Sequence, residues 1–267
     1  MKSGKVTLRQ LAAMKRERTP LTMLTAYDAG FARVLDAAGI DCVLVGDSLG
    51  NVIQGRETTV PVTLEDMIYH VTCVRRGLER ALLVADLPFL TYADVTPAIE
   101  SARALMQAGA EMVKIEGGRA VVPQVRALAS LGVPVCGHVG LTPQSVHQLS
   151  GFRVQGRGAE ARERLLEDAR ALEEAGAGLL VVECVPEPLG RALSETLTIP
   201  VIGIGAGRGV DGQVLVLHDL LGMDPGSAPR FARDFLSGAD GISGAVSAYV
   251  SAVRDGRFPA DDEVYAE

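Results

Sequence analysis

Short apolar runs that stop at an ionisable side chain recur along this sequence. The run Cys42–Val45 is followed by Gly46 and Asp47. Later runs deliver, at or near their ends, Asp86, Glu116, His138 and Glu183. Continuous apolar runs of this length are typical of strands that are covered on both faces of a sheet. Their repeated polar endings, with helix-like segments between them, predict a single site assembled from several parts of the chain.

The hydrophobic pattern predicts about eight strands that alternate with helices. The expected strands are 21–25, 42–45, 82–85, 112–115, 133–137, 179–182, 200–204 and 213–217. The expected helices are 7–15, 28–38, 63–77, 96–108, 120–131, 159–175 and 188–196, with one or two more after residue 229. Alternation of this kind indicates βαβ units and a parallel sheet.

A closed (β/α)8 TIM barrel and an open doubly wound sheet both satisfy this order of elements. In a barrel the carboxyl ends of all strands converge on one mouth, whereas an open sheet gathers its ligand groups at one crevice. The barrel is favoured, because ionisable residues end many different strands. We expect 1–267 to form one barrel domain, with the N-terminal helix closing one end and a loose acidic tail from about residue 258.

Composition narrows the class of protein. Of the 267 residues, 48% are hydrophobic and 4% aromatic, and the net charge is −7. An acidic chain without a Lys/Arg stripe is not typical of proteins that bind nucleic acid or anionic membranes. The sequence shows neither a signal-peptide core nor a run that could span a membrane. The four cysteines form no Cys-x-x-Cys pair, so a cytoplasmic, reduced location is expected.

Asp47 and Asp86 are candidate metal ligands. In a barrel they leave neighbouring strands at the same face, where two carboxylates repel each other unless a cation lies between them. Oxygen ligands of this kind suit Mg²⁺, with water or substrate completing the coordination shell. Glu116, on the next strand, is expected to reach the metal directly or through water. The alternative is that each aspartate caps the turn or helix that follows it.

Lys114 and Glu116 are two residues apart in one strand, so both point to the same side of it. Burying this pair inside a barrel is costly unless it serves a site, although a structural ion pair remains the alternative. If it is functional, Lys114 is expected to bind a substrate carboxylate or to stabilise an enolate oxygen.

Glu183 and His138 are the candidate acid–base groups. A carboxylate that is partly removed from water, as Glu183 is expected to be at the end of its apolar strand, can act as a general base near neutral pH. The alternative for Glu183 is a helix cap before Pro186. His138 is placed to hydrogen-bond a developing oxyanion, unless it is a satisfied core histidine. The glycine-rich run 203–207 lies too late for a dinucleotide fingerprint and is expected to be flexible backbone that a ligand approaches closely.

All of these residues except Glu183 lie within stretches that together resemble the ketopantoate hydroxymethyltransferase family. The stretches are 46–50 (Gly-Asp-Ser-Leu-Gly), 61–70, 86–89 (Asp-Leu-Pro-Phe), 113–118 (Val-Lys-Ile-Glu-Gly-Gly), 137–144 (Gly-His-Val-Gly-Leu-Thr-Pro-Gln), 154–157 (Val-Gln-Gly-Arg) and 203–207. Their joint order and spacing are specific, and the resemblance runs from about residue 7 to 259. Small departures at Thr91 and Ser150 affect loop details only.

The resemblance implies a TIM barrel of the phosphoenolpyruvate/pyruvate superfamily that assembles as a homodecamer. It implies transfer of a hydroxymethyl group from 5,10-methylenetetrahydrofolate to 3-methyl-2-oxobutanoate, through a Mg²⁺-stabilised enolate, giving 2-dehydropantoate for pantothenate and coenzyme A synthesis. The alternatives are a folate-independent, Mg²⁺-dependent 2-oxoacid lyase or aldolase of the same superfamily, and a non-catalytic barrel that binds a 2-oxoacid. The resemblance does not assign folate-binding residues.

The resemblance also implies roles for individual residues. Asp47 and Asp86 correspond to Mg²⁺ ligands that also bind substrate, and Glu116 corresponds to a further contributor to the metal. Ser48 and Lys114 correspond to residues that bind the ketoacid. Glu183 corresponds to the proton acceptor, and His138 to a histidine on the oxyanion side.

Overall fold

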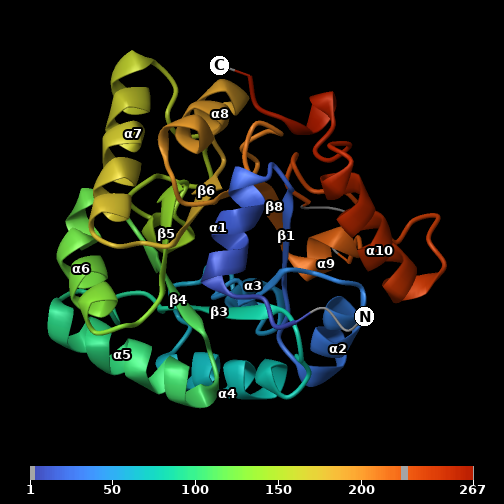
Figure 1. Cartoon of the computed structure of the whole chain (residues 1–267), viewed down its shortest axis with the longest axis horizontal. Coiled ribbons are helices and arrows are strands. Elements are labelled where there is room, and N and C mark those ends of the chain that lie inside the picture. Colours follow the sequence, from blue (N-terminus) through green and yellow to red (C-terminus); the bar gives the residue numbers. More distant parts are fainter. Residues whose placement is uncertain (1–3, 224–227, 267) are drawn as a thin grey trace.

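A computed structural model describes residues 4–223 and 228–266 and shows a closed barrel of eight parallel strands (Figure 1). Each strand pairs with the next in chain order, and the last pairs with the first. The strands are β1 (Leu21–Thr25), β2 (Cys42–Val45), β3 (Leu82–Asp86), β4 (Met112–Glu116), β5 (Val135–Gly140), β6 (Leu179–Glu183), β7 (Val201–Ile204) and β8 (Gly212–Leu215). The predicted TIM barrel is therefore confirmed.

Helices cover the barrel on the outside, as Figure 1 shows. They are α2 (Ala29–Ala37), α3 (Leu49–Val52), α4 (Leu64–Arg75), α5 (Val95–Ala108), α6 (Val122–Ser130), α7 (Ala159–Glu174), α8 (Glu187–Thr196), α9 (Leu217–Leu220) and α10 (Gly241–Arg254). In α5, Ala98, Ala102 and Leu105 recur at helical spacing and are fully buried. The helices therefore pack against the strands through apolar side chains. The polar residues at the strand ends are left at the mouth of the barrel.

The first helix, α1 (Leu8–Arg16), lies at the amino ends of the strands. Thr7 and Gln10 form a capping box that starts it. At its other end, Lys15 Nζ lies 2.7 Å from Asp211 Oδ2, and Asp211 directly precedes β8. An ideal Cβ on Gly178, just before β6, would lie 3.3 Å from Leu8. The helix thus closes this end, as expected, and the carboxyl ends open at the opposite side.

The end of the last strand differs from the sequence prediction. β8 ends at Leu215, and the next residues turn into the short helix α9. The backbone N–H of Leu217 donates to Thr25 Oγ1 at 2.9 Å, which ties the start of α9 to β1. His218 lies within this helix and does not end a strand. An apolar run of this length does not distinguish a strand from a buried helical turn, which explains the error.

The acidic tail is docked where the structure describes it, so the expectation of a loose tail is wrong for 258–266. Glu263 Oε2 lies 2.7 Å from Arg233 Nη2. The N–H of Glu187, at the start of α8, donates to the carbonyl of Tyr265 at 2.9 Å. Figure 1 shows the C-terminal end of the chain beside α8. These contacts fasten the tail to the barrel.

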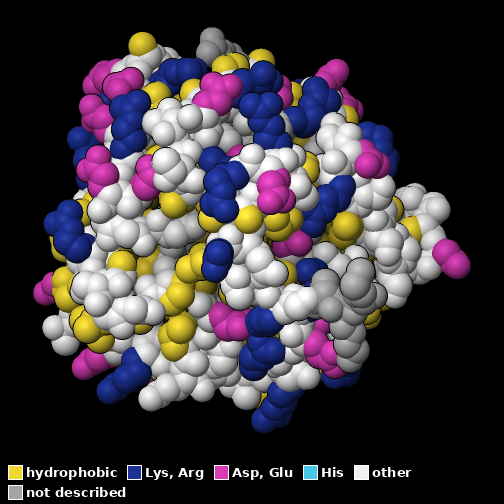
Figure 2. All heavy atoms as spheres, viewed as in Figure 1, with side chains coloured by type: hydrophobic (Ala, Val, Ile, Leu, Met, Phe, Trp, Pro, Cys, Tyr) yellow, Lys and Arg dark blue, Asp and Glu magenta, His cyan; other side chains and the backbone are white. Residues whose placement is uncertain are grey.

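Acidic and basic side chains are interspersed on the face shown in Figure 2, which has no large patch of a single charge. Among residues 4–223 and 228–266, no helix has the length and apolar character needed to cross a membrane.

Candidate active site

The two predicted metal ligands lie side by side at the mouth. β2 and β3 are paired, so Asp47, two residues beyond β2, comes next to Asp86, the last residue of β3. The N–H of Asp47 donates to Asp86 Oδ2 at 3.0 Å. The residues are 3% and 2% exposed. Neither acts as the helix cap considered as an alternative, because the N-cap of α3 is Ser48 and that of α5 is Asp94.

Lys114 and Glu116 point into the barrel from β4, and both are buried. Lys114 Nζ lies 2.9 Å from Asp86 Oδ1 and 3.5 Å from Glu116 Oε1. His138 on β5 approaches both: its Nδ1 is 3.2 Å from Lys114 Nζ and 3.2 Å from Glu116 Oε1. The prediction that Lys114 and Glu116 share one side of their strand is confirmed, and three strands meet at this cluster.

Glu183 completes the ring from the end of β6. Its Oε2 lies 3.3 Å from His138 Nε2 without a hydrogen bond, so the contact is one of charge. The Glu183 side chain is 14% exposed, against 2% for His138. It does not cap α8, whose first turn follows Pro186 without a side-chain cap. Among the charged groups of this cluster, Glu183 is therefore the one most accessible from the mouth.

Gly140 holds the backbone of Glu183 in place. Its φ is +95°, and an ideal Cβ there would lie 2.2 Å from the carbonyl oxygen of Glu183. The same carbonyl accepts a hydrogen bond from the N–H of Leu141 at 2.8 Å. Only glycine allows β5 to approach the end of β6 this closely.

Gly140→Ala is expected to lower both stability and turnover, because its Cβ displaces Glu183. The stability loss should be about 1–3 kcal/mol, measured by denaturant unfolding. The matched control is Gly132→Ala, which has a similar φ of +83° but meets nothing within 4 Å. If both variants lose stability and only Gly140→Ala loses kcat, the contact with Glu183 matters. Equal kcat values would contradict this interpretation.

Ser48 follows Asp47 and is fixed by a tyrosine from the neighbouring strand. The hydroxyl groups of Tyr27 and Ser48 are 2.8 Å apart. Tyr27 itself is buried, and its carbonyl lies 2.7 Å from His70 Nδ1. The position of Ser48 therefore depends on Tyr27, which follows β1, and on His70, which lies in α4.

Burial and mutual repulsion shift the pKa values of the two aspartates upward. Burial, together with the charges of Asp86 and Glu116, raises the pKa of Asp47 to about 8. The pKa of Asp86 is also raised by burial, although Lys114 opposes the shift. These directions indicate an excess of negative charge at the mouth.

Glu116 and His138 are held in their charged forms. Burial acts to raise the pKa of Glu116, but the charges of Lys114 and His138 outweigh it and hold this pKa below its ordinary value. Burial and Lys114 act to lower the pKa of His138, yet Glu116 and Glu183 outweigh them and raise it to about 9. His138 is therefore a cation near neutral pH and no ordinary core histidine.

The donor set fits a divalent cation. Two cationic groups, Lys114 and His138, face four carboxyl groups, those of Asp47, Asp86, Glu116 and Glu183. Full ionisation would leave two negative charges without a partner, which one divalent ion neutralises. Among the described residues, Asp86 Oδ1 is buried and faces the Lys114 ammonium at 2.9 Å, and oxygen ligands of this type suit Mg²⁺.

Glu116 differs from the two aspartates in its surroundings. Its Oε1 accepts from His138, and its Oε2 accepts from the N–H of Gln144 at 3.1 Å. Within residues 4–223 and 228–266, no group of three His, Cys, Asp or Glu side chains is arranged to hold a metal ion. A direct contact of Glu116 with the metal therefore stays a prediction. Mg²⁺ commonly uses one or two carboxylates and keeps several waters.

Nearly the whole chain matches a known protein family. Residues 5–261 match the family model described as ketopantoate hydroxymethyltransferase. A relative from Shewanella amazonensis, named 3-methyl-2-oxobutanoate hydroxymethyltransferase, is 54% identical over 98% of this chain and 99% of its own length. One of the same name from Shewanella sp. (strain MR-4) is 55% identical over 98% and 100%. This chain belongs to the ketopantoate hydroxymethyltransferase family. It is thus an enzyme, a hydroxymethyltransferase of pantothenate synthesis.

Solved structures share the barrel of this hydroxymethyltransferase. Phosphoenolpyruvate phosphomutase from Streptomyces platensis subsp. rosaceus superposes with a TM-score of 0.61 and 17% identity, over 99% of this chain and 92% of that one. Phosphonopyruvate hydrolase in complex with oxalate and Mg²⁺ gives 0.61 and 12%, over 93% and 84%. A 2,3-dimethylmalate lyase, described as a PEP mutase/isocitrate lyase superfamily member, gives 0.57 and 17%, over 78% and 80%. At these identities the likeness shows the fold alone.

Three residues of the hydroxymethyltransferase mouth were not predicted as site residues. They are Tyr27, Tyr92 and Gln144, which contact Ser48, Gln144 and Asp47 respectively. Gln144 ends the stretch that begins Gly137-His138, so the sequence contained a signal for it. The two tyrosines had none, because nothing in their local pattern distinguishes them from core aromatics.

The glycine-rich run 203–207, at the end of β7, packs against neighbouring side chains. An ideal Cβ on Gly205 would lie 2.7 Å from Phe231, and one on Gly207 would lie 2.3 Å from Glu187. The expected close approach of a ligand is thus replaced here by close packing of side chains.

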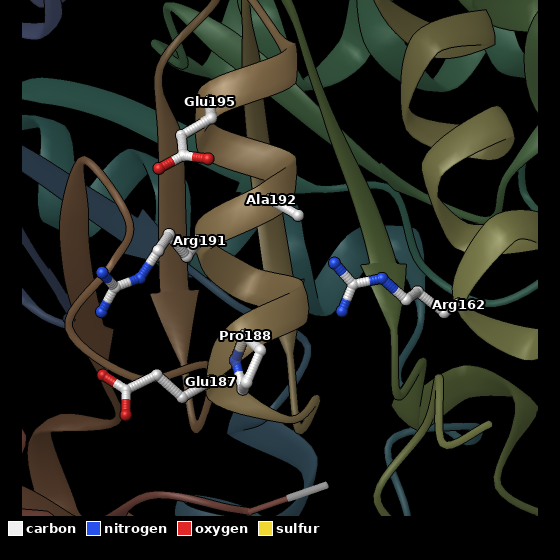
Figure 3. A pocket seen from close by; sticks show the side chains of 6 residues that line it. All are labelled: Arg162, Glu187, Pro188, Arg191, Ala192 and Glu195. Carbon is white, nitrogen blue, oxygen red and sulfur yellow. The ribbon is translucent and has the colours of Figure 1, made fainter. Parts of the chain in front are cut away.

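A crevice of about 330 Å³ lies between α7 and α8, on the helical layer of the hydroxymethyltransferase. Figure 3 shows Arg162 extending from α7 towards α8. The lining residues are Arg162, Glu187, Pro188, Arg191, Ala192 and Glu195. None of the predicted site residues lines this crevice, so it is separate from the mouth.

Proposed function

We propose that this enzyme transfers the one-carbon unit of 5,10-methylenetetrahydrofolate to C3 of 3-methyl-2-oxobutanoate, with Mg²⁺ bound by Asp47 and Asp86. The observation that carries the proposal is the cluster of Lys114, His138 and Glu183 beside these aspartates at one barrel mouth. The family membership supports the acceptor. The folate donor and the cation rest on the resemblance and on the charge balance of the mouth.

The ketoacid carries a carboxylate and a neighbouring keto oxygen, both of which need positive or hydrogen-bonding partners. Ser48, held by Tyr27, and the ammonium of Lys114 bind these oxygens in the proposal. Mg²⁺ bound by the aspartates would act as a Lewis acid on the keto group and make the C3 proton easier to remove. The other steps fall to side chains of the chain itself.

Glu183 takes the C3 proton in the proposal, because it is the accessible carboxylate at the end of β6. Lys114 and His138, both cations near neutral pH, stabilise the negative charge that develops on the ketoacid oxygen. The carbanion carbon then forms a bond to the methylene carbon of the folate, as one of the two carbon–nitrogen bonds of that carbon breaks. Water displaces the remaining folate nitrogen from that carbon and supplies the hydroxyl group. The proton taken from C3 and the proton from water go to the two folate nitrogens, so ketoacid, methylenetetrahydrofolate and water give 2-dehydropantoate and tetrahydrofolate.

Turnover with and without 5,10-methylenetetrahydrofolate tests the proposal. We expect 2-dehydropantoate to form only when ketoacid, folate and Mg²⁺ are all present, and chelation of the metal to stop the reaction. Cleavage of a 2-oxoacid without folate would instead indicate a lyase or aldolase. Binding of the ketoacid without any turnover would indicate a non-catalytic binding protein.

A further inference from the structure

One amide side chain, that of Gln144, uses all its polar atoms inside the mouth. Gln144 lies in a 3-10 turn (Pro143–Ser145) beyond β5 and is 3% exposed. Its Nε2 donates to Asp47 Oδ2 at 2.8 Å and to the carbonyl of Leu87 at 2.9 Å. Its Oε1 accepts from the hydroxyl of Tyr92. A carbonyl only accepts, so the contact with Leu87 fixes which end of the amide carries the nitrogen.

The same residue also reaches a second carboxylate. Its backbone N–H donates to Glu116 Oε2 at 3.1 Å. Gln144 therefore touches acidic side chains from the ends of β2 and β4, across the β3 end that lies between them. Tyr92, which orients the amide, is held in turn through its carbonyl by Gln124 Nε2 of α6 at 3.0 Å. The amide is thus anchored by two connections of the barrel, one after β2 and one after β3.

The hydrogen bond from Gln144 restricts the rotation of the Asp47 carboxylate. The terminal torsion of an aspartate is soft, so a neighbouring donor decides which oxygen points where. Gln144 occupies Oδ2 of Asp47, which leaves Oδ1 for a ligand. Asp86 differs, because the N–H of Asp47 occupies its Oδ2 and the Lys114 ammonium lies 2.9 Å from its Oδ1. Asp47 thus keeps one oxygen tied to Gln144 and presents the other to a ligand.

We propose that Gln144 is a positioning residue that fixes which oxygen of Asp47 faces the divalent cation. This inference rests on the proposed cation site at Asp47 and Asp86. Groups that hold metal-ligating carboxylates typically change metal affinity by about 10–100-fold when they are removed. Without its amide partner, the Asp47 carboxylate rotates more freely and no longer presents a fixed oxygen to the cation.

Mn²⁺ binding, measured by electron paramagnetic resonance or calorimetry without substrate, tests the inference. Gln144→Met keeps the volume of the side chain but removes both donors, and it should weaken Mn²⁺ binding by about 10–100-fold. Tyr92→Phe removes only the hydroxyl that orients the amide and should weaken binding less. In the Gln144→Met background, Tyr92→Phe should add nothing, because both act through one contact.

Controls separate positioning from folding and from the cation site itself. Gln107→Ala removes an exposed amide from α5 and should leave Mn²⁺ affinity unchanged. Asp47→Asn should abolish binding, which assigns the ion to the mouth. Thermal unfolding shows which variants are folded, and if Gln144→Met is not, Tyr92→Phe decides. Unchanged affinity in folded Gln144→Met or in Tyr92→Phe overturns the inference. Absence of binding to the wild type overturns the cation site on which it rests.

Discussion

Glu183→Gln is expected to abolish exchange of the C3 proton of 3-methyl-2-oxobutanoate while leaving binding of this ketoacid intact. Glutamine matches the shape of glutamate but does not accept a proton. A positioned general base contributes about 10²–10⁴-fold to a rate, so exchange should fall by that factor. Loss of the C3–H signal in D₂O, followed by nuclear magnetic resonance with Mg²⁺ and without folate, measures this step alone.

The matched control is Glu187→Gln, four residues further along the chain. Glu187 begins α8, and its Oε1 accepts from the N–H of Arg208 at 3.2 Å, away from His138. The same change of charge there should leave exchange as it is in the wild type. Exchange that persists in Glu183→Gln would show that another group takes the proton.

Lys114→Met is expected to impair both folding stability and catalysis. It removes the ammonium group that lies 2.9 Å from Asp86 and 3.5 Å from Glu116. Breaking a buried ion pair by removing one partner typically costs about 3–5 kcal/mol. Loss of a group that stabilises charge in the transition state should lower kcat by about 10²–10³-fold. Denaturant unfolding and steady-state kinetics measure the two effects.

The pH dependence of this stability difference follows from the direction of the Lys114 shift. Burial acts to lower the pKa of Lys114, but Asp86, Glu116 and Asp47 outweigh it and raise the pKa well above the ordinary value of 10.5. A cationic group with a raised pKa stabilises the fold fully below its unfolded pKa, and this stability is lost only as pH rises through the folded value. The wild type should therefore keep the contribution of Lys114 throughout the neutral range.

Lys15→Met is the control, because it also removes a largely buried lysine from an ion pair. Lys15 pairs with Asp211 at 2.7 Å at the closed end of the barrel. It should cost some stability and leave kcat unchanged. If Lys114→Met behaves in the same way, with kcat within twofold of the wild type, then Lys114 and Glu116 form the purely structural ion pair that the sequence left open.

The barrel and the charged strand ends were predictable because each depends on a local pattern. Asp47, Asp86 and Glu183 are each recognised from their own segment, as an acidic residue at the end of an apolar run. Alternation along β4 was enough to put Lys114 and Glu116 on one side of the strand. Parallel pairing in chain order then brings these ends together without further information.

Contacts made by loop residues were not predictable in this way. Gln144 and Asp47 are separated by 97 positions, and Gln144 lies in irregular backbone beyond β5. Its role depends on how one amide is oriented by Tyr92 and Leu87, which no periodicity encodes. The docked tail was missed for a similar reason, since Glu263 meets Arg233 only after both segments have folded onto the barrel.

A crystal structure with Mn²⁺ and 3-methyl-2-oxobutanoate tests the central claim most directly. Anomalous scattering locates the Mn²⁺ independently of the protein model. We expect a single peak at the mouth, about 2.1 Å from one oxygen each of Asp47 and Asp86, with the ketoacid beside Ser48 and its C3 facing Glu183. An ion bound elsewhere, or a ketoacid whose C3 points away from Glu183, would contradict the account.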